Sequence, residues 1–297
     1  MKKIFILIVF LVFVYSGVEA RPHSYNNYHH SSSESRPVYL IGTDKHMTEQ
    51  KFPGCDKHYV ETETIINYYS DGTRRTYSNS TIFNSDGSVL VADCQSVKHV
   101  IYNNNHYFIV KKYKEGYKII DSSANVLTKR NYSRMEEVSS NRILVKADKK
   151  YGIIDLQENI VIPVKYQKLE MKGDNIFLAK LNGYYGIIEI NNNELIKCEC
   201  EKIKQVYDVF ILKKYGKYGL ADMYGYTILE PKYDKIKKLD EYILVKNNDK
   251  YGVYDYKGEK VSDIQYKKIR LERNCLQGQI ENNNWVKIEQ KYYPTIE

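Results

Sequence analysis

Apolar and polar positions recur with a period of 33 or 34 residues through residues 107–297, and this rhythm is the strongest signal in the chain. Its clearest mark is an aromatic residue, in most units a tyrosine followed by glycine. The aromatic column consists of Tyr117, Tyr151, Tyr185, Tyr218, Tyr251 and Trp285. A fixed period of this length is typical of tandem structural repeats, so we predict five full units and a truncated sixth.

Other columns keep the same period. An acidic residue lies four positions after the aromatic, at Asp121, Asp155, Glu189, Asp222, Asp255 and Glu289. A lysine lies five positions before it, at Lys112, Lys146, Lys180, Lys213 and Lys246. Fifteen positions after the aromatic come Tyr132, Tyr166, Cys200, Tyr233 and Tyr266.

Each unit is expected to hold three short antiparallel strands. In the second unit these are RILVK at 142–146, YGIID at 151–155 and IVIPVKYQKL at 160–169, with polar turns between them. Consecutive apolar residues such as Ile153 and Ile154 indicate a strand that is buried on both faces. The glycine beside the aromatic is expected to allow a neighbouring ring or backbone to approach closely.

One such unit cannot bury both of its faces, whereas stacked units can. The fold class we predict is therefore all-β: an open curved array of three-stranded units, with a closed β-propeller as the alternative. The last unit departs from the pattern, because Val286 follows Trp285 and polar Gln277 and Gln279 replace apolar residues. Polar replacements at one end are typical of a terminal cap.

These units resemble the WG-repeat family of bacterial proteins. The motif of that family is Trp-Gly, an aliphatic pair, an acid, a turn and an Ile-Pro-x-x-Tyr-like strand, and this chain has KYGIID followed by IVIPVKY at 150–166. The resemblance covers about residues 108–297, although tyrosine replaces the defining tryptophan in five units. It implies β-rich tandem units, often in exported or surface proteins, and it supplies no catalytic residues.

Residues 37–106 are predicted to form a small region of β-hairpins. The Ser-Asp-Gly turns at 70–72 and 85–87 separate alternating runs, which favours a three-stranded meander. Cys55 and Cys94 are the only cysteines here, and we pair them in a disulfide that would tie the region together. Cys198 and Cys200 would point to one side of a strand, Cys275 is a distant candidate partner for either, and the odd count leaves at least one free thiol.

The N-terminus has the layout of a secretory signal peptide. Lys2 and Lys3 precede a twelve-residue apolar run, and Val18 and Ala20 provide small residues before a cleavage point at the end of residues 1–20. An uncleaved anchor is the alternative. Residues 21–36 are polar and are expected to form a flexible tether, in which His23, His29 and His30 would bind metal only incidentally.

Composition and charge argue against a nucleic-acid-binding protein and against a membrane-spanning one. The chain has 297 residues, of which 30 are tyrosines. Its formal net charge is +8, and all of the excess positive charge lies after residue 100. Bases and acids are interspersed, which is typical of a solvated surface and also compatible with weak attraction to an anionic polymer. We expect an exported, periplasmic, cell-surface or extracellular protein, no nucleic-acid partner and no stable membrane span after cleavage.

Two function classes remain open. The first is a binding or scaffold module that contacts protein or polysaccharide at the cell envelope, and the second is an extracytoplasmic hydrolase with its site in or beside the N-terminal region. We favour the first and expect no enzyme, because no nucleophile or nucleotide motif occurs and the acids recur in every unit. We predict no catalytic, cofactor-binding or metal-ligating residues. The aromatic column is expected to pack between units, with a ligand platform as its functional alternative.

Overall fold

The computed structural model describes residues 37–288, and the fold there is all-β. Within these residues, 25 strands form six antiparallel sheets, and residues from Leu40 onwards belong to one compact unit. The predicted signal peptide, the predicted tether and Glu289 lie outside the described residues. No helix among the described residues is long and apolar enough to cross a membrane.

The first sheet contains six strands in chain order: β1 (Leu40–Lys51), β2 (His58–Tyr69), β3 (Arg74–Asn84), β4 (Val89–Tyr102), β5 (Asn105–Lys112) and β6 (Gly116–Asp121). Both predicted Asp-Gly turns are present, with φ of 81° at Gly72 and 85° at Gly87. The meander has more strands than predicted, because β4 extends past β3 and pairs with β5. The boundary predicted between residues 106 and 107 falls within β5, so the first repeat contributes to this sheet.

The predicted disulfide between Cys55 and Cys94 is absent, and all five cysteines are free thiols. Both residues are buried in the core of the first sheet. Burial raises the pKa of the Cys94 thiol to about 11. The thiol of Cys55, in the loop between β1 and β2, lies close to two imidazole rings instead.

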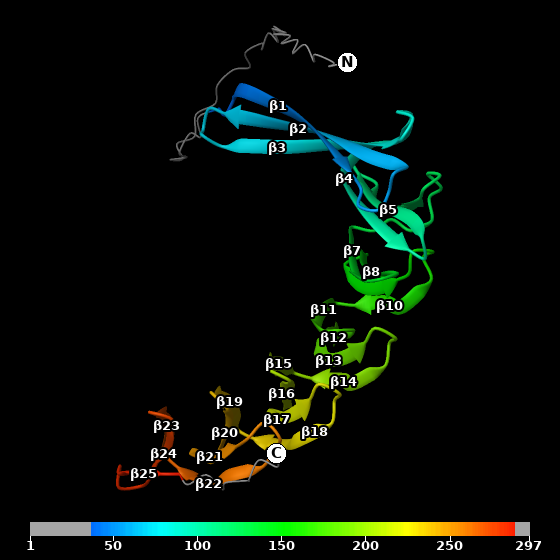
Figure 1. The fold of residues 1–297 in the computed structure, drawn as a ribbon. Coiled ribbons are helices and arrows are strands. Elements are labelled where there is room, and N and C mark those ends of the chain that lie inside the picture. The colour runs from blue at the N-terminus through cyan, green and yellow to red at the C-terminus, as the bar shows by residue number, and fades with distance from the viewer. Residues whose placement is uncertain (1–36, 289–297) are drawn as a thin grey trace, which may run out of the picture. The chain divides into compact units, whose positions relative to one another are not determined.

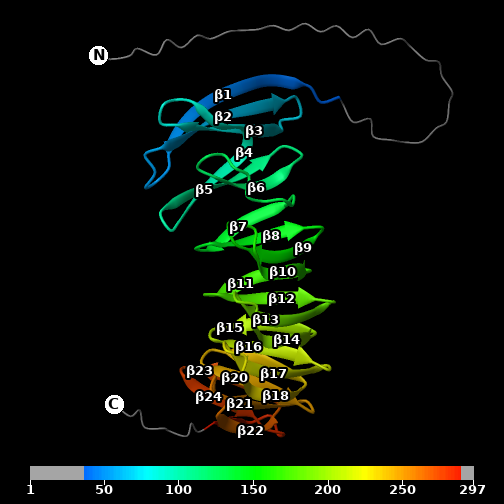
Figure 2. The same cartoon turned by 90° about the vertical axis from the view of Figure 1, so that its right-hand side faces the viewer.

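Four sheets of four strands follow (Figure 1, Figure 2). The second sheet holds β7 (Arg134–Ser139), β8 (Arg142–Ala147), β9 (Lys150–Ile154) and β10 (Ile160–Tyr166), and the third holds β11 (Lys168–Gly173), β12 (Ile176–Leu181), β13 (Tyr184–Glu189) and β14 (Glu194–Cys200). The fourth holds β15 (Lys202–Val206), β16 (Val209–Lys214), β17 (Lys217–Asp222) and β18 (Thr227–Tyr233), and the fifth holds β19 (Lys235–Leu239), β20 (Tyr242–Asn247), β21 (Lys250–Tyr254) and β22 (Lys260–Tyr266).

The last sheet has three strands, β23 (Lys268–Glu272), β24 (Cys275–Gln279) and β25 (Trp285–Lys287). No strand from the first sheet completes it, so the described strands do not close into a propeller. The prediction of an all-β series of small antiparallel units is confirmed.

The number of strands in a complete unit differs from the prediction, being four instead of three. The segment predicted as one strand over 160–169 is divided at Gln167, where the backbone N–H donates to the carbonyl of Lys180 in the next sheet, at 2.8 Å. Residues after Gln167 therefore form β11, the first strand of the following sheet. Glu201, Asp234 and Lys267 make the equivalent bond at 2.8 Å in their own units.

The hydrophobic core lies between successive sheets. On β8, Ile143 and Val145 pack toward the first sheet, whereas Leu144 packs toward the third. On β12, Phe177 packs toward the second sheet and Leu178 toward the fourth. Alternate side chains of one strand thus serve two different interfaces, as their opposite orientations require. Neighbouring sheets bury the faces that a single sheet would leave in water, as predicted.

The glycine after the aromatic lies where another strand comes very close. A Cβ on Gly152 would lie 2.6 Å from the carbonyl oxygen of Ile162 and 2.7 Å from Cα of Val164. The equivalent Cβ on Gly186 would lie 2.5 Å from the carbonyl oxygen of Ile196. The obstacles are backbone atoms of the fourth strand of the same sheet, so the predicted close approach is confirmed.

Replacing Gly152 with alanine is expected to lower the free energy of unfolding by about 2–3 kcal/mol, because backbone atoms must shift to admit the methyl group. Gly173→Ala is the matched control, since its Cβ would meet only the Met223 side chain at an ordinary 3.5 Å. Denaturant unfolding of both variants checks this. Equal stability of the two would contradict the steric argument.

Candidate functional site

The residues of the aromatic column occupy equivalent places in successive sheets. Tyr151 on β9 is half-buried, lies directly opposite Lys146 on β8 and pairs with Tyr166 on β10. The Lys146 ammonium is 4.9 Å from the centre of the Tyr151 ring, and Lys180 is 4.9 Å from that of Tyr185. The predicted lysine column therefore pairs across strands with the aromatic column.

The two ends of the column differ slightly from its middle. Tyr117 on β6 lies opposite Lys111, one residue before the predicted Lys112. Trp285 on β25 lies opposite Gln279, and the Arg270 guanidinium is 4.2 Å from its ring. Tyr218 and Tyr251 keep the central arrangement opposite Lys213 and Lys246. Each aromatic belongs to its own sheet, and Tyr117, Tyr151, Tyr185 and Tyr218 also pack against the cores between sheets.

The acid column shapes turns. The Asp155 carboxylate accepts hydrogen bonds from the backbone N–H groups of Gln157 at 2.9 Å and Asn159 at 2.8 Å. Asp121, Asp222 and Asp255 accept the same pair of bonds in their own turns. An aspartate that binds the backbone two residues ahead mimics a turn, so these carboxylates have a structural role.

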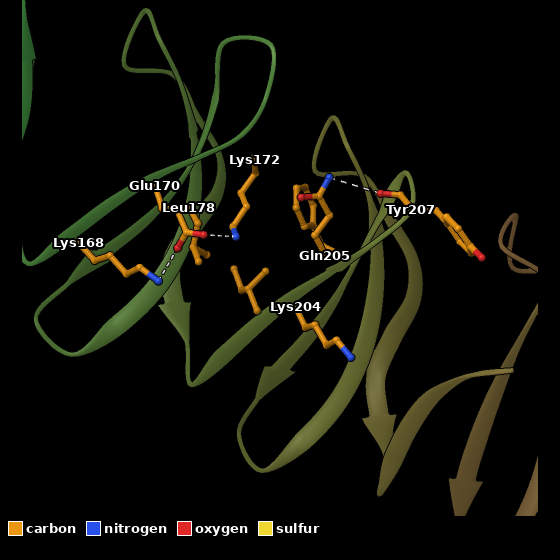
Figure 3. Close-up of a pocket in the computed structure, with 9 residues that line it drawn as sticks. Lys168, Glu170, Lys172, Leu178, Lys204, Gln205 and Tyr207 are labelled. Atoms are coloured by element: carbon orange, nitrogen blue, oxygen red, sulfur yellow. Dashed lines mark hydrogen bonds and ion pairs between the residues drawn. The ribbon is translucent and has the colours of Figure 1, made fainter. Parts of the chain in front are cut away.

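The groove between the third and fourth sheets is a site that the periodic analysis missed (Figure 3). It has a volume of about 620 Å³, and its apolar floor is Leu178, Ile203 and Phe210. Its rim comes from the first strands β11 and β15 and is rich in lysine. The Glu170 carboxylate lies 2.5 Å from both Lys168 and Lys172, and these two lysines lower its pKa.

Lys204 lies beside this groove, whereas the Tyr207 ring points away from it, toward residues of the fifth sheet (Figure 3). Tyr207 is 58% exposed as a whole residue, and Tyr256 packs edge-on against its ring. The Lys238 ammonium lies 3.8 Å from its centre and donates a hydrogen bond to its hydroxyl. The Lys204 ammonium extends beside the groove and is joined to none of the other residues drawn in Figure 3. The exposed Lys204 cation suits a ligand that carries a negative charge.

An equivalent groove of about 490 Å³ lies one unit earlier, between the second and third sheets. Leu144, Leu169 and Phe177 occupy there the positions that Leu178, Ile203 and Phe210 occupy in the later groove. Its rim carries Arg134 and Glu136, whose charged groups lie 2.5 Å apart. The groove is therefore a repeated element whose floor is constant and whose rim varies.

In the fourth and fifth sheets, the first strands carry more positive than negative charge. The basic positions Arg134 and Lys168 are each followed two residues later by glutamate, but Lys202 and Lys235 are followed by lysine. We call Lys202, Lys204, Lys235 and Lys237 the first-strand lysines. All four are exposed, and none forms an ion pair with any residue between 37 and 288.

Like charges also face each other across these strands. Lys202 lies directly opposite Lys213, and Lys235 lies directly opposite Lys246. Opposed like charges destabilise a sheet. Glu201, at 2.7 Å, and Asp249, at 2.6 Å, compensate Lys213 and Lys246, whereas the first-strand lysines stay uncompensated among the described residues. This edge of the two sheets is therefore a positively charged surface whose first-strand lysines form no ion pair within residues 37–288.

The second tyrosine column, fifteen positions after the aromatic column, allows a test of what a buried hydroxyl contributes to stability. Tyr132 and Tyr166 are equivalent and fully buried, but the Tyr132 hydroxyl donates to Glu158 at 3.0 Å, whereas the Tyr166 hydroxyl has no partner in the described chain. Tyr132→Phe should lower the free energy of unfolding by about 1–3 kcal/mol, because it removes a bond to a charged acceptor. Tyr166→Phe should leave stability unchanged or raise it by about 1 kcal/mol. Denaturant unfolding of both variants measures the difference, and equal losses would contradict it.

The solved structures that the chain resembles include distant matches of low sequence identity. The chain is 13% identical to Kluyveromyces lactis Hsv2 with loop 6CD replaced by a Gly-Ser linker, with a TM-score of 0.32 over 76% of this chain and 85% of that one. It is 10% identical to the Neurospora crassa Pan2 WD40 domain, with a TM-score of 0.25 over 86% of this chain and 96% of that one. No curated protein matches the sequence.

The family comparison confirms the resemblance drawn from the Tyr-Gly motif. The family described as "WG containing repeat" matches residues 151–185, which run from one aromatic of the column to the next. The same columns and the same four-stranded sheets continue on the C-terminal side of this match. Residues 151–185 are thus a WG-containing repeat in which tyrosine stands in the place of the defining tryptophan.

Proposed function

We propose that this chain is an exported binding module that holds an anionic polysaccharide of the cell envelope along its first-strand lysines. The observation that carries the proposal is the charge on β15 and β19, where four exposed lysines have no carboxylate partner between residues 37 and 288. A cluster of unneutralised cations attracts a polyanion over several ångströms and loses that attraction as salt screens it.

The repetition of the groove favours a polymer over a small ligand. Two successive units offer the same groove floor, so a chain of similar sugar units could contact several sheets at once. Several weak contacts along one polymer add up through effective concentration, which is how a shallow surface achieves useful affinity.

Binding fits the recurring acids better than hydrolysis does. Glycoside hydrolysis needs two carboxyl groups that flank one bond. The aspartates of the acid column are instead engaged by backbone N–H groups in separate turns. We therefore propose a binding or scaffold role and no enzymatic one.

Export is the part of the proposal that rests on residues 1–20. We expect the mature chain to begin at Arg21, because Val18 and Ala20 satisfy the small-residue requirement for signal cleavage. Intact mass and N-terminal sequencing of the protein recovered from the envelope or medium check this. Replacing Ala20 with a bulky residue should leave the precursor uncleaved, and a mature protein that retains Met1 would contradict the expectation.

The lysines are tested with a soluble acidic polysaccharide, such as polygalacturonate, in affinity electrophoresis. The Lys204→Glu/Lys237→Glu double variant should bind at least about tenfold more weakly than the unaltered chain. Glu170→Gln should bind more tightly, because it releases Lys168 and Lys172 from their shared carboxylate. Binding of the unaltered chain should weaken as salt rises from about 0.05 M to about 0.5 M.

The Lys51→Glu/Lys257→Glu double variant is the matched control, since it makes the same charge change on two exposed lysines, one on β1 and one in the turn before β22. It should leave the affinity nearly unchanged, and a neutral polysaccharide of similar length should not bind. Equal weakening by the two double variants would reduce the effect to net charge and contradict a specific surface. Binding to acidic proteins but not to any acidic polysaccharide would replace the proposed partner.

A further inference from the structure

A thiol and two imidazoles converge on one face of the first sheet. Cys55, His99 and His106 each offer one metal-ligating atom, and the three atoms lie within 4.8 Å of one another. Cys55 is buried, and both histidines are half-buried. Neither the aromatic column nor the grooves between sheets involve these residues, so the cluster is a separate feature of the molecule.

The strand register explains why the two histidines meet. β4 and β5 form a tight antiparallel hairpin in which Ile101 lies opposite His106 and His99 lies opposite Phe108. His99 and His106 are therefore diagonal neighbours on one face. Their rings stack with centroids 5.1 Å apart and an angle of 6° between planes, and His99 Nε2 is 2.9 Å from His106 Nδ1.

Cys55 reaches the same place from the loop between β1 and β2. A turn holds this loop, in which the Cys55 backbone N–H donates to the carbonyl of Phe52 at 3.1 Å. The Phe52 ring packs 4.8 Å from His99 and 5.1 Å from Phe108. The loop thus places both the Cys55 thiol and the Phe52 ring against the pair of histidines.

The surroundings suit neutral imidazoles. Burial lowers the pKa of His99 to about 4, and the nearby His106 and His58 act in the same direction. Burial also lowers the pKa of His58, which packs edge-on against Phe108 and whose Nδ1 has no partner among the described residues. A histidine binds metal through an unprotonated nitrogen, so the proton shared between His99 Nε2 and His106 Nδ1 must move to another ring nitrogen when a metal binds there.

We propose that Cys55, His99 and His106 bind one zinc ion. A thiolate and two imidazole nitrogens match the preference of zinc for sulfur and nitrogen ligands. Tetrahedral zinc holds such atoms about 3.3–3.6 Å apart, so the 2.9 Å nitrogen pair need open only slightly and the thiol need approach by about 1 Å. Three protein ligands leave a fourth position for water or an added ligand.

The proposal also accounts for the absent disulfide. A sulfur that binds zinc is a thiolate engaged with the metal and is not available to Cys94. Both cysteines lie in one buried cluster, so the metal and the disulfide are alternative uses of the same thiol. The redox state of Cys55 therefore reports on the site.

Cobalt titration of the full, reduced, chelator-stripped chain tests the proposal. Co²⁺ should bind with one ion per chain at this site, giving a thiolate-to-cobalt charge-transfer band and the strong visible bands of four-coordinate cobalt, and Zn²⁺ should abolish both. His23, His29 and His30 cannot produce the charge-transfer band, because residues 21–36 contain no cysteine. Absence of the band from the unaltered chain would overturn the proposal without any variant.

Variants then locate the site. Cys55→Ser should remove the charge-transfer band, and His99→Ala or His106→Ala should weaken zinc binding by more than the roughly 10–100-fold cost of losing an outer-sphere partner. The controls are Cys94→Ser, which alters a buried thiol of the same core, and His46→Ala, which alters an exposed histidine on β1. Both should keep the site. A band that survives Cys55→Ser, or disappears in Cys94→Ser, would place the metal elsewhere.

Alkylation of the unaltered chain gives a second measurement that needs no variant. Zinc should slow the modification of Cys55 at least tenfold, as mapped by peptide mass spectrometry, while modification of Cys275 on β24 stays unchanged. Equal protection of both cysteines would indicate general stabilisation, and no protection of Cys55 would exclude it as a ligand. Either outcome would overturn the assignment.

Discussion

The fold depends on one constraint, which is that the central strands of each repeat are apolar on both faces. On β8 and β12 consecutive buried side chains point in opposite directions, so one sheet must contact a neighbour on each side. Burying a large aliphatic side chain stabilises the fold by about 1.5–3 kcal/mol, and a sheet that lacks a neighbour loses several of these contributions at once. Stability is therefore a property of adjacent pairs of sheets, and no single unit supplies it.

This constraint explains which parts of the structure could be predicted. Residues that serve the interfaces must repeat, so the aromatic, glycine, acid and second-tyrosine columns were visible in the sequence, and the close approach at Gly152 followed from them. The division at Gln167 was not visible, because apolar and polar residues run on without a glycine or proline there. Only the hydrogen bond from Gln167 to Lys180 of the next sheet ends one strand and begins another.

The candidate sites escaped prediction for a related reason. A search for period finds residues that stay the same, whereas the rim of the grooves changes from Glu136 and Glu170 to Lys204 and Lys237. The sequence signal for the lysine-rich rim was the pair of segments KIKQV and KIKKL, in which lysines alternate with buried positions. Cys55 was assigned to Cys94 because only two cysteines lie in that region, and its nearness to His99 and His106 depends on a loop that the pattern did not position.

Constancy and variation thus separate the structural residues of this molecule from those of the proposed binding surface. Asp155 and Tyr151 recur because every turn and every sheet needs them, and the first-strand residues vary because little of the core depends on them. The first sheet has a different problem, since its long strand β1 is almost fully exposed and has no following sheet to cover it. The β1–β2 loop closes instead over the hairpin of β4 and β5, which carries His99 and His106, through Phe52 and Cys55. A zinc ion bound there would join that loop to the hairpin, which is the stabilising role that small β regions otherwise give to a disulfide.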